Sequence, residues 1–208
     1  MVRQDAEPLS QMALRLEKHV TGMRRTGSPA EILDAANAAA DAIESSIAKG
    51  TGEDDRVALT TVKRFTFNAA ADCWPGWSIT GPDLDATTLL GALRLAQRHA
   101  ALVESLVLGG IQRGTSTWLV GAFELALGRL TEASLSFERA REYYAQASAP
   151  GLALLTEGYQ AILERLSAKG SPADAQHFEE VLSRIAAGGF EDGTEWIEQL
   201  RCAYAVFS

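Results

Sequence analysis

Histidine, cysteine and carboxylate side chains are the groups most able to perform chemistry, and this sequence keeps them apart. His19, His99 and His177 are widely separated, and none has a histidine or cysteine three or four residues away. A zinc site needs several ligands at such short spacings. Cys73 and Cys202 are also distant from each other. We therefore predict no metal site and two reduced, half-buried thiols, with a disulfide as the alternative.

Sequence motifs of known reaction centres are not found either. Asp54-Asp55 and Glu179-Glu180 are adjacent pairs, which point to different faces of a helix and indicate solvated charge. The nucleophile elbow, the Walker loop and the dinucleotide-binding glycines are absent. Gly109-Gly110 lacks the lysine that a phosphate-binding loop requires. We predict that the protein is not an enzyme and has no cofactor; catalysis by residues that meet only in the fold is the alternative.

The most unusual local sequence is residues 73–78, in which Trp74 and Trp77 flank a Pro-Gly pair. Such a segment favours a rigid turn with a large apolar surface. The simplest interpretation is that both rings close the end of a helix pair. The functional alternative is an aromatic ledge for a ligand or a hot spot for a protein partner. Asp72, directly before the turn, is expected to bond its amides.

The rest of the chain indicates helices. Hydrophobic residues make up 47% of the 208 residues, ample for a core, and alanine and leucine far outnumber valine and isoleucine. Capping serines followed by proline stand at Ser28 and Ser171, and Arg24-Arg25 supply positive charge at a helix end, with an anion site as the alternative. Apolar stripes predict one all-α domain (1–208) of about nine helices, near 7–23, 28–50, 55–74, 81–108, 115–127, 131–147, 151–169, 171–187 and 190–207.

The clearest unit is the pair of predicted helices at 115–127 and 131–147. Gly128 is suited to end the first helix, and Thr131 is a candidate cap for the second. Glycines 109, 110 and 114 are expected to break the chain before the pair. Three small residues would let the two backbones approach closely: Gly121, Ala133 and Ala140.

This spacing resembles the tetratricopeptide repeat, a helical hairpin of about 34 residues. The match covers 114–148 and consists of Trp118-x-x-Gly121, Gly128-x-Leu130-x-x-Ala133-x-x-x-Phe137-x-x-Ala140, and Pro150. Glu124 departs from the pattern, because the family usually has a large apolar residue there and Phe123 lies one position earlier. The resemblance implies a right-handed array of antiparallel helix pairs, followed here by a terminal helix at 190–207.

In that family, ligands usually lie along the inner surface, which the first helix of each pair lines. With Gly121 and Gly158 as matching positions, the residues implied here are Trp118, Ala122, Leu125, Leu155, Tyr159 and Ile162. None is a lysine, arginine or asparagine, so we do not expect a clamp for a peptide carboxylate. An apolar inner surface is either the protein's own core or an open site for an apolar partner.

Charge and composition narrow the function further. The net charge is −8, and a nucleic-acid partner would require a basic face. No signal peptide or membrane span is evident, so we expect a cytoplasmic protein. The resemblance implies a non-catalytic protein–protein interaction module or scaffold that binds a protein or peptide through the six inner-surface residues. Trp74 and Trp77 are added as candidate contacts because of their own aromatic surface.

Two alternatives to this interpretation stay open. The first is a self-associating subunit, a homo-oligomer that covers an apolar face of the terminal helix. Trp196 and Tyr204 lie on that face, together with Leu200 and Phe207. The second is a small-molecule binder or enzyme with a pocket near Trp74 and Trp77.

Overall fold

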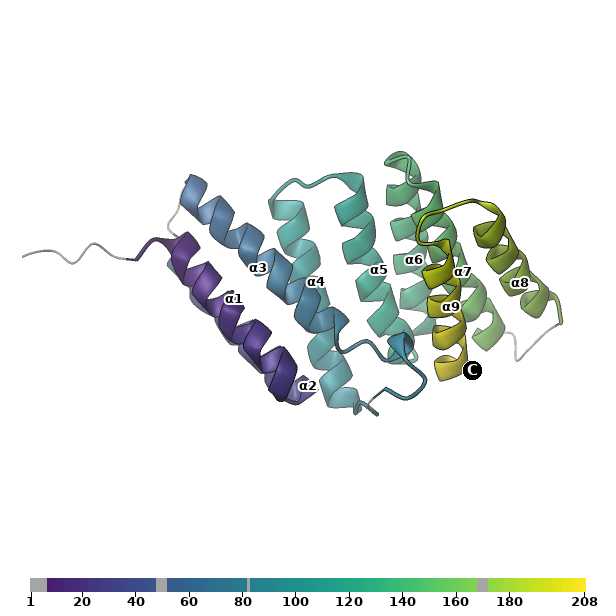
Figure 1. Cartoon of the computed structure of the whole chain (residues 1–208), viewed down its shortest axis with the longest axis horizontal. Helices are drawn as coiled ribbons and strands as arrows, with labels where there is room; N and C mark the ends of the chain where they lie inside the picture. The colour runs from purple at the N-terminus through teal and green to yellow at the C-terminus, as the bar shows by residue number, and fades with distance from the viewer. Residues whose placement is uncertain (1–6, 48–51, 82, 168–171) are drawn as a thin grey trace, which may run out of the picture.

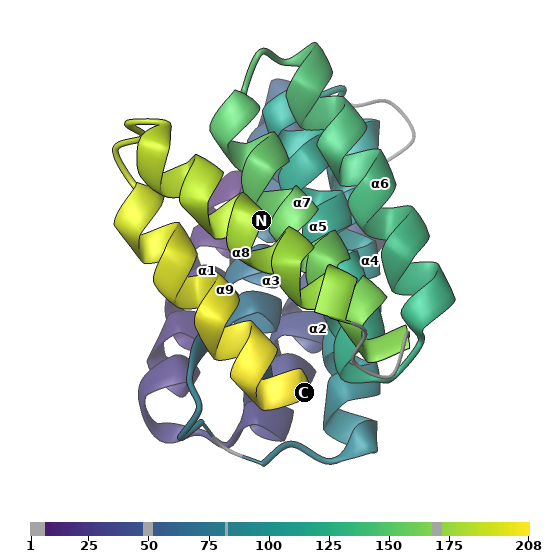
Figure 2. The ribbon, with the colours of Figure 1, turned by 90° about the vertical axis from the view of Figure 1, so that its right-hand side faces the viewer.

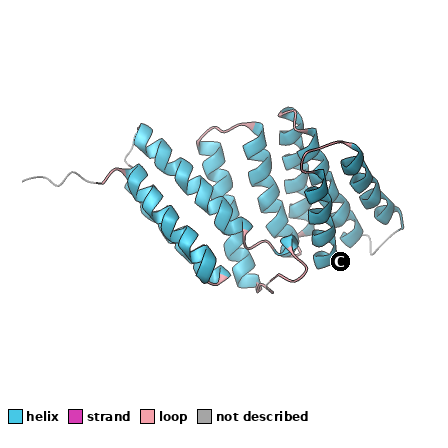
Figure 3. Cartoon of the chain, viewed as in Figure 1, coloured by secondary structure: helices cyan, strands magenta, loops and turns pink. Residues whose placement is uncertain are grey.

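The computed structural model describes residues 7–47, 52–81, 83–167 and 172–208, and every regular element within these ranges is helical (Figure 1, Figure 3). These ranges hold nine α-helices and one short 3₁₀ helix, so the predicted all-α fold is confirmed. In chain order they are α1 (Leu9–Thr26), α2 (Pro29–Ser46), α3 (Glu53–Ala71), η1 (Pro75–Trp77), α4 (Ala86–Ser105), α5 (Gly110–Ala126), α6 (Leu130–Gln146), α7 (Pro150–Ser167), α8 (Pro172–Ala187) and α9 (Gly193–Phe207).

The helices form a row in which sequence neighbours lie side by side (Figure 1). Helix α1 packs on α2 and α3, and from α3 to α8 each helix contacts the next. Helix α9 leaves the row and contacts η1, α7 and α8. Figure 2 looks at the C-terminal end of the row, where α8 and α9 lie nearest the viewer. One continuous core of buried side chains runs through the array.

The starts of α2 and α4 are fixed by side chains that bond free backbone amides. At α2 the Ser28 hydroxyl accepts from the Glu31 amide, and the Glu31 carboxylate accepts from the Ser28 amide at 2.7 Å, which confirms the predicted start. Helix α4 begins later than predicted, at Ala86, because Asp85 accepts from the Thr88 amide at 2.7 Å. The predicted start at Ser171 and the predicted stop at Gly50 lie outside the described residues.

Helices α5 and α6 lie against each other as predicted. Gly128 has φ +70°, and the Arg129 amide donates to the Glu124 carbonyl at 2.9 Å, a hydrogen-bond pattern typical of helix ends with a left-handed glycine. The expectation for Thr131 is wrong. Helix α6 begins at Leu130 and has no side-chain cap, so Thr131 lies inside its first turn.

The glycines expected to break the chain before α5 serve a different purpose. Gly110 and Gly114 lie within the helix rather than before it. A Cβ atom on Gly114 would be 2.6 Å from Cε1 of Tyr144, and one on Gly121 would be 2.9 Å from Cε1 of Phe137. Both glycines therefore make room for aromatic rings of α6, so the predicted close approach is confirmed at Gly121.

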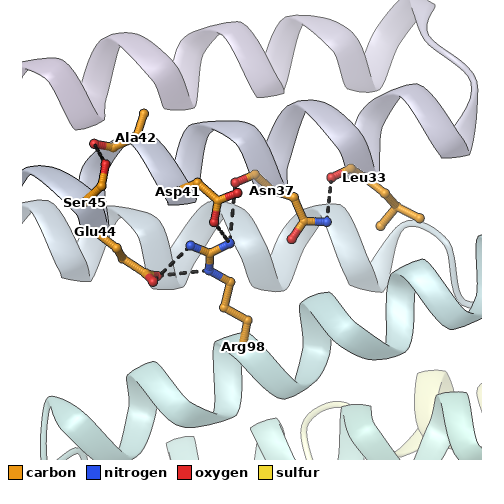
Figure 4. Close-up of polar contacts among 7 residues, drawn as sticks. All are labelled: Leu33, Asn37, Asp41, Ala42, Glu44, Ser45 and Arg98. Atoms are coloured by element: carbon orange, nitrogen blue, oxygen red, sulfur yellow. Dashed lines mark hydrogen bonds and ion pairs between the residues drawn. The ribbon is translucent and has the colours of Figure 1, made fainter.

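A half-buried arginine joins α2 to α4 (Figure 4). Nη1 of Arg98 lies 2.8 Å from Oδ1 of Asp41, and Nη2 lies 2.9 Å from Oε2 of Glu44. Nη1 also donates to the Asn37 carbonyl at 3.4 Å. Because the Arg98 side chain is only 19% exposed, these contacts fix it between the two helices.

Candidate functional site

An aromatic cluster occupies the place where η1, α5, α7 and α9 meet, and Trp74 is at its centre. The Trp74 ring centroid lies 4.9 Å from that of Trp77, 5.6 Å from Trp118 and 5.6 Å from Tyr159. The ring of Phe207, at the end of α9, lies 6.4 Å from it. The loop after α3 and the terminal helix therefore meet on the same side of the array, beside each other in Figure 1.

The turn after α3 fixes the Trp74 ring. Its Nε1 donates to the carbonyl of Ala122 at 3.3 Å, so the loop is bonded to α5. Gly76 lies directly over the ring, where a Cβ atom would come within 2.4 Å of Trp74 Cζ2. The Pro-Gly pair thus allows the chain to reverse on the face of its own tryptophan, which agrees with the simpler interpretation of residues 73–78.

Seven of the eight predicted partner-binding residues lie inside the protein. None of these seven is more than 8% exposed: Trp74, Trp118, Ala122, Leu125, Leu155, Tyr159 and Ile162. Helix α9 covers this inner surface, because Leu200 packs on Gly158 and Gln199 Nε2 donates to the Tyr159 hydroxyl at 2.7 Å. The inner surface is thus part of the protein's own core, one of the two alternatives that the sequence left open, and in this structure a partner cannot reach it.

Trp77 is the exception, with 45% of its surface exposed. Its Nε1 donates to the Ala71 carbonyl at 2.6 Å, and its ring meets the Trp74 ring edge-on. The exposed ring is therefore held in one orientation. Ile79, two residues later, is 66% exposed and extends the apolar surface.

An open hollow of about 630 Å³ lies beside the Trp77 ring. The end of α1, the start of α2 and the end of α3 contribute to it, with the lining residues Thr21, Arg24, Arg25, Gly27, Pro29, Ile32, Asp72 and Trp77. We call this place the Trp77 hollow. An apolar ring, an aliphatic side chain and two guanidinium groups thus face one space.

The Trp77 hollow carries a local excess of positive charge on an acidic protein. Arg24 forms a bidentate contact with Asp72, in which Nε and Nη2 donate to the two carboxylate oxygens and Nη2 lies 2.8 Å from Oδ1. Asp72 was expected to bond the turn amides, and this expectation is wrong because the nearby guanidinium binds its carboxylate. Arg25 forms no ion pair within the described ranges. One positive charge in the hollow is therefore left to attract an anionic group.

Histidine, cysteine and acidic side chains are the groups that could hold a metal ion. No three histidine, cysteine or acidic side chains gather as a metal site in the part of the chain that the structure describes. Cys73 is fully rather than half-buried, Cys202 is half-buried, and both are free. Burial raises the pKa of the Cys73 thiol to about 11, so it is protonated at neutral pH.

Sequence reasoning singled out Trp77, Asp72 and the Arg24-Arg25 pair separately, but it did not place them at one site. Arg25 and Ile32 come from two other helices, and only the fold brings them beside the tryptophan. The sequence signal for this site was the pair of arginines at the end of α1. They were interpreted as positive charge at a helix end, and an anion site was the alternative.

Comparison of the chain with protein-family models, curated proteins and solved structures finds no match. Among the described helices, none has the length and apolar character needed to cross a bilayer.

Proposed function

We propose that this protein is a cytoplasmic, non-catalytic interaction module of the tetratricopeptide-like kind, and that it binds its partner at the Trp77 hollow. The observation that carries the proposal is the fixed, half-exposed Trp77 ring next to Arg25, which has no ion pair with any residue that the structure describes. Tryptophan and arginine are the residues most enriched at energetic hot spots of protein interfaces. A ring that is already held in place also loses little conformational freedom when a partner binds.

The chemistry of the hollow defines the partner. Trp77 and Pro29 offer an apolar surface, and Arg25 offers a guanidinium that can bind a carboxylate through two parallel hydrogen bonds. The partner that fits is a peptide segment with a large apolar side chain close to an aspartate or glutamate. This differs from the inner-surface mode implied by the family resemblance, because η1 and α9 occupy that surface.

Self-association through α9 has less support. Leu200 is buried, and Trp196, Tyr204 and Phe207 pack against the core of the same chain. Sedimentation at tens of micromolar tests this alternative directly.

A peptide library displayed on phage tests the proposal. Selection on the wild-type protein should enrich sequences in which an acidic residue adjoins an aromatic or large aliphatic one. Trp77→Ala should weaken binding of the enriched peptides at least about tenfold. Arg25→Glu should also weaken it about tenfold, because the charge that attracts the carboxylate is reversed.

Two matched variants control for general effects of the substitutions. Leu135→Ala removes an apolar side chain on α6 that is 63% exposed, and Arg201→Glu reverses an exposed arginine on α9. Both should bind the peptides as the wild type does, and circular dichroism should show all four variants folded. The proposal fails if no motif is enriched, or if folded Trp77→Ala and Arg25→Glu proteins bind the peptides unchanged.

A further inference from the structure

A second pocket lies between α3, α4 and α5, away from the Trp77 hollow. Its volume is about 200 Å³, and three helices line it with Lys63, Arg64, Phe67, Asn68, His99, Val103, Ile111, Gln112 and Thr115. We call it the His99 pocket. An engineered apolar cavity of about 150 Å³ can hold benzene, so the His99 pocket has room for a single substituted ring.

The geometry fixes the protonation state of His99. The residue is 4% exposed, and its Nδ1 lies 2.8 Å from the carbonyl oxygen of Lys63. A carbonyl can only accept, so Nδ1 must carry the proton. Burial, assisted by the positive charge of Lys63, lowers the pKa of His99 to about 4, and the ring is neutral at pH 7. Nε2 is therefore an acceptor with a free lone pair.

No group within the described ranges donates to this acceptor. Of the other polar groups of the pocket, Lys63 is a donor only, Arg64 and Thr115 are already bonded, and the side-chain amides of Asn68 and Gln112 form no hydrogen bond to Nε2 in the described part of the chain. Arg64 binds Glu17 through two contacts of 2.5 Å, and the Thr115 hydroxyl both accepts from Tyr144 and donates to a backbone carbonyl. A ligand that satisfies Nε2 must bring its own hydroxyl or N–H.

The surroundings narrow the class of ligand further. The positive charge of Lys63 opposes an ammonium ligand, and a carboxylate has no hydrogen to donate to Nε2. The walls favour an aromatic body, because the Phe67 and His99 rings lie 5.1 Å apart and tilted by 53°, with Val103 and Ile111 beside them. Aromatic rings pack well on such edges and faces.

We propose that the His99 pocket binds a small neutral phenol, whose hydroxyl donates a hydrogen bond to Nε2 of His99 while its ring lies against the apolar walls. This site shares no residue with the Trp77 hollow. A failure of phenol binding would therefore leave the proposed interaction with a peptide unaffected, and the reverse also holds.

Titration with three one-ring probes tests the proposal. Phenol should bind to the full-length protein with a Kd of about 1 mM, a normal value for so small a ligand. Anisole, in which a methyl group replaces the hydroxyl hydrogen, and toluene should bind about fivefold to tenfold more weakly, because each leaves Nε2 without a donor. In ¹⁵N spectra of the histidine side chains, phenol should shift Nε2 of His99 and leave His19 unchanged.

Two variants locate the binding. His99→Phe keeps a ring of similar shape but has no acceptor, so phenol and anisole should bind to it equally. Ile111→Trp changes a residue that is 45% exposed and fills the pocket, so it should abolish binding of all three probes even if His99→Phe does not fold. Gln97→Ala, an exposed residue of α4 outside the pocket, should leave binding within about twofold. Anisole that binds the wild type as tightly as phenol, or an unshifted His99 Nε2 at saturating phenol, would overturn the proposal.

Discussion

In addition to the apolar core that runs through both regions, helices α1 to α4 are linked by contacts of arginine with carboxylates, whereas α5 to α9 are linked largely by bulky side chains that lie on glycines. In the first region Arg64 of α3 binds Glu17 of α1 at 2.5 Å, and Arg98 of α4 binds Asp41 and Glu44 of α2. A further link runs from the Leu9 amide of α1 to the Asp54 carboxylate of α3 at 2.7 Å.

The second region shows the other kind of contact. The ring of Tyr144 covers Gly114, and the ring of Phe137 covers Gly121. Further along, Trp196 lies on Gly151, and Leu200 lies on Gly158, where added Cβ atoms would come within 2.7 Å of them. Each glycine brings two helices together without any charged group.

The two kinds of contact respond to different changes. Ion pairs that are partly exposed weaken in salt but tolerate changes of volume, since their long side chains can move. The packing of an aromatic ring on a glycine is insensitive to salt, but it leaves no room for a Cβ atom on that glycine. The two regions should therefore differ in which substitutions destabilise them and in how salt and pH alter the damage.

The largest effect is expected from filling a glycine in the second region. Gly121→Val would place its Cβ 2.9 Å from Phe137 Cε1 and 3.0 Å from Ser136 Cβ, so α5 and α6 must separate. We expect the free energy of unfolding to fall by about 3 kcal/mol. Unfolding in urea, followed by circular dichroism, measures the change, and 1 M NaCl should not alter it.

Gly22→Ala in α1 is the matched control for this substitution. Nothing lies within 4 Å of a Cβ atom added there, so alanine should instead stabilise the protein by about 0.5–1 kcal/mol through its better helix propensity. The proposed difference between the two regions is wrong if Gly121→Val and Gly22→Ala change the free energy of unfolding in the same direction.

Arg98→Met should have the second-largest effect. Methionine keeps an unbranched apolar stem but loses both ion pairs and the bond to the Asn37 carbonyl. Asp41 and Glu44 can still reach water, so we expect a loss of only about 1–2 kcal/mol. Urea unfolding at low salt and in 1 M NaCl should show that the loss shrinks when salt screens the charges.

Arg15→Met tests whether exposure decides the size of this effect. Arg15 also pairs with a carboxylate, that of Glu7, but its side chain is 63% exposed compared with 19% for Arg98. Its replacement should cost clearly less than Arg98→Met. Equal losses for the two variants would show that the half-buried position of Arg98 does not strengthen its contacts.

The sequence predicted those features that depend on neighbours along the chain. Apolar spacing located all nine described helices, and the cap at Ser28 and the turn at Gly128 follow from contacts within a few residues. The errors come from contacts between distant residues. Gly114 was taken for a helix break because nothing nearby reveals that the Tyr144 ring covers it.

The candidate site also combines a feature that the local sequence predicts with features that depend on distant residues. Trp77 could be identified from its own segment, but its exposure depends on how the turn lies against Trp74 and α5. The burial of Trp118 and Tyr159 could not be derived, because α9 returns across the array from about 40 residues further along the chain. The His99 pocket is likewise lined by residues of three helices, and no local sequence pattern predicts it.

The smallest expected effect concerns a charged contact inside the second region. His177 of α8 lies 2.7 Å from the Glu164 carboxylate and 3.7 Å from that of Glu157, both on α7, and Arg184 of α8 also binds Glu157. The hydrogen bond to Glu164, together with the charges of both glutamates, raises the pKa of His177 above its usual value. A protonated histidine therefore stabilises the α7–α8 contact.

The sign of the pH dependence follows from this shift. A raised pKa in the folded state means that the stabilisation is fully present below about pH 6.5, the pKa in the unfolded chain, and is lost as the pH rises through the folded value. His177→Gln should therefore destabilise the protein more at pH 6 than at pH 8.5. Because the histidine is 35% exposed, the loss at either pH should be smaller than the loss caused by Arg98→Met. Urea unfolding of both proteins at the two pH values measures this difference. A loss that is equal at both, or greater at pH 8.5, would mean that protonation of His177 does not stabilise the contact between α7 and α8.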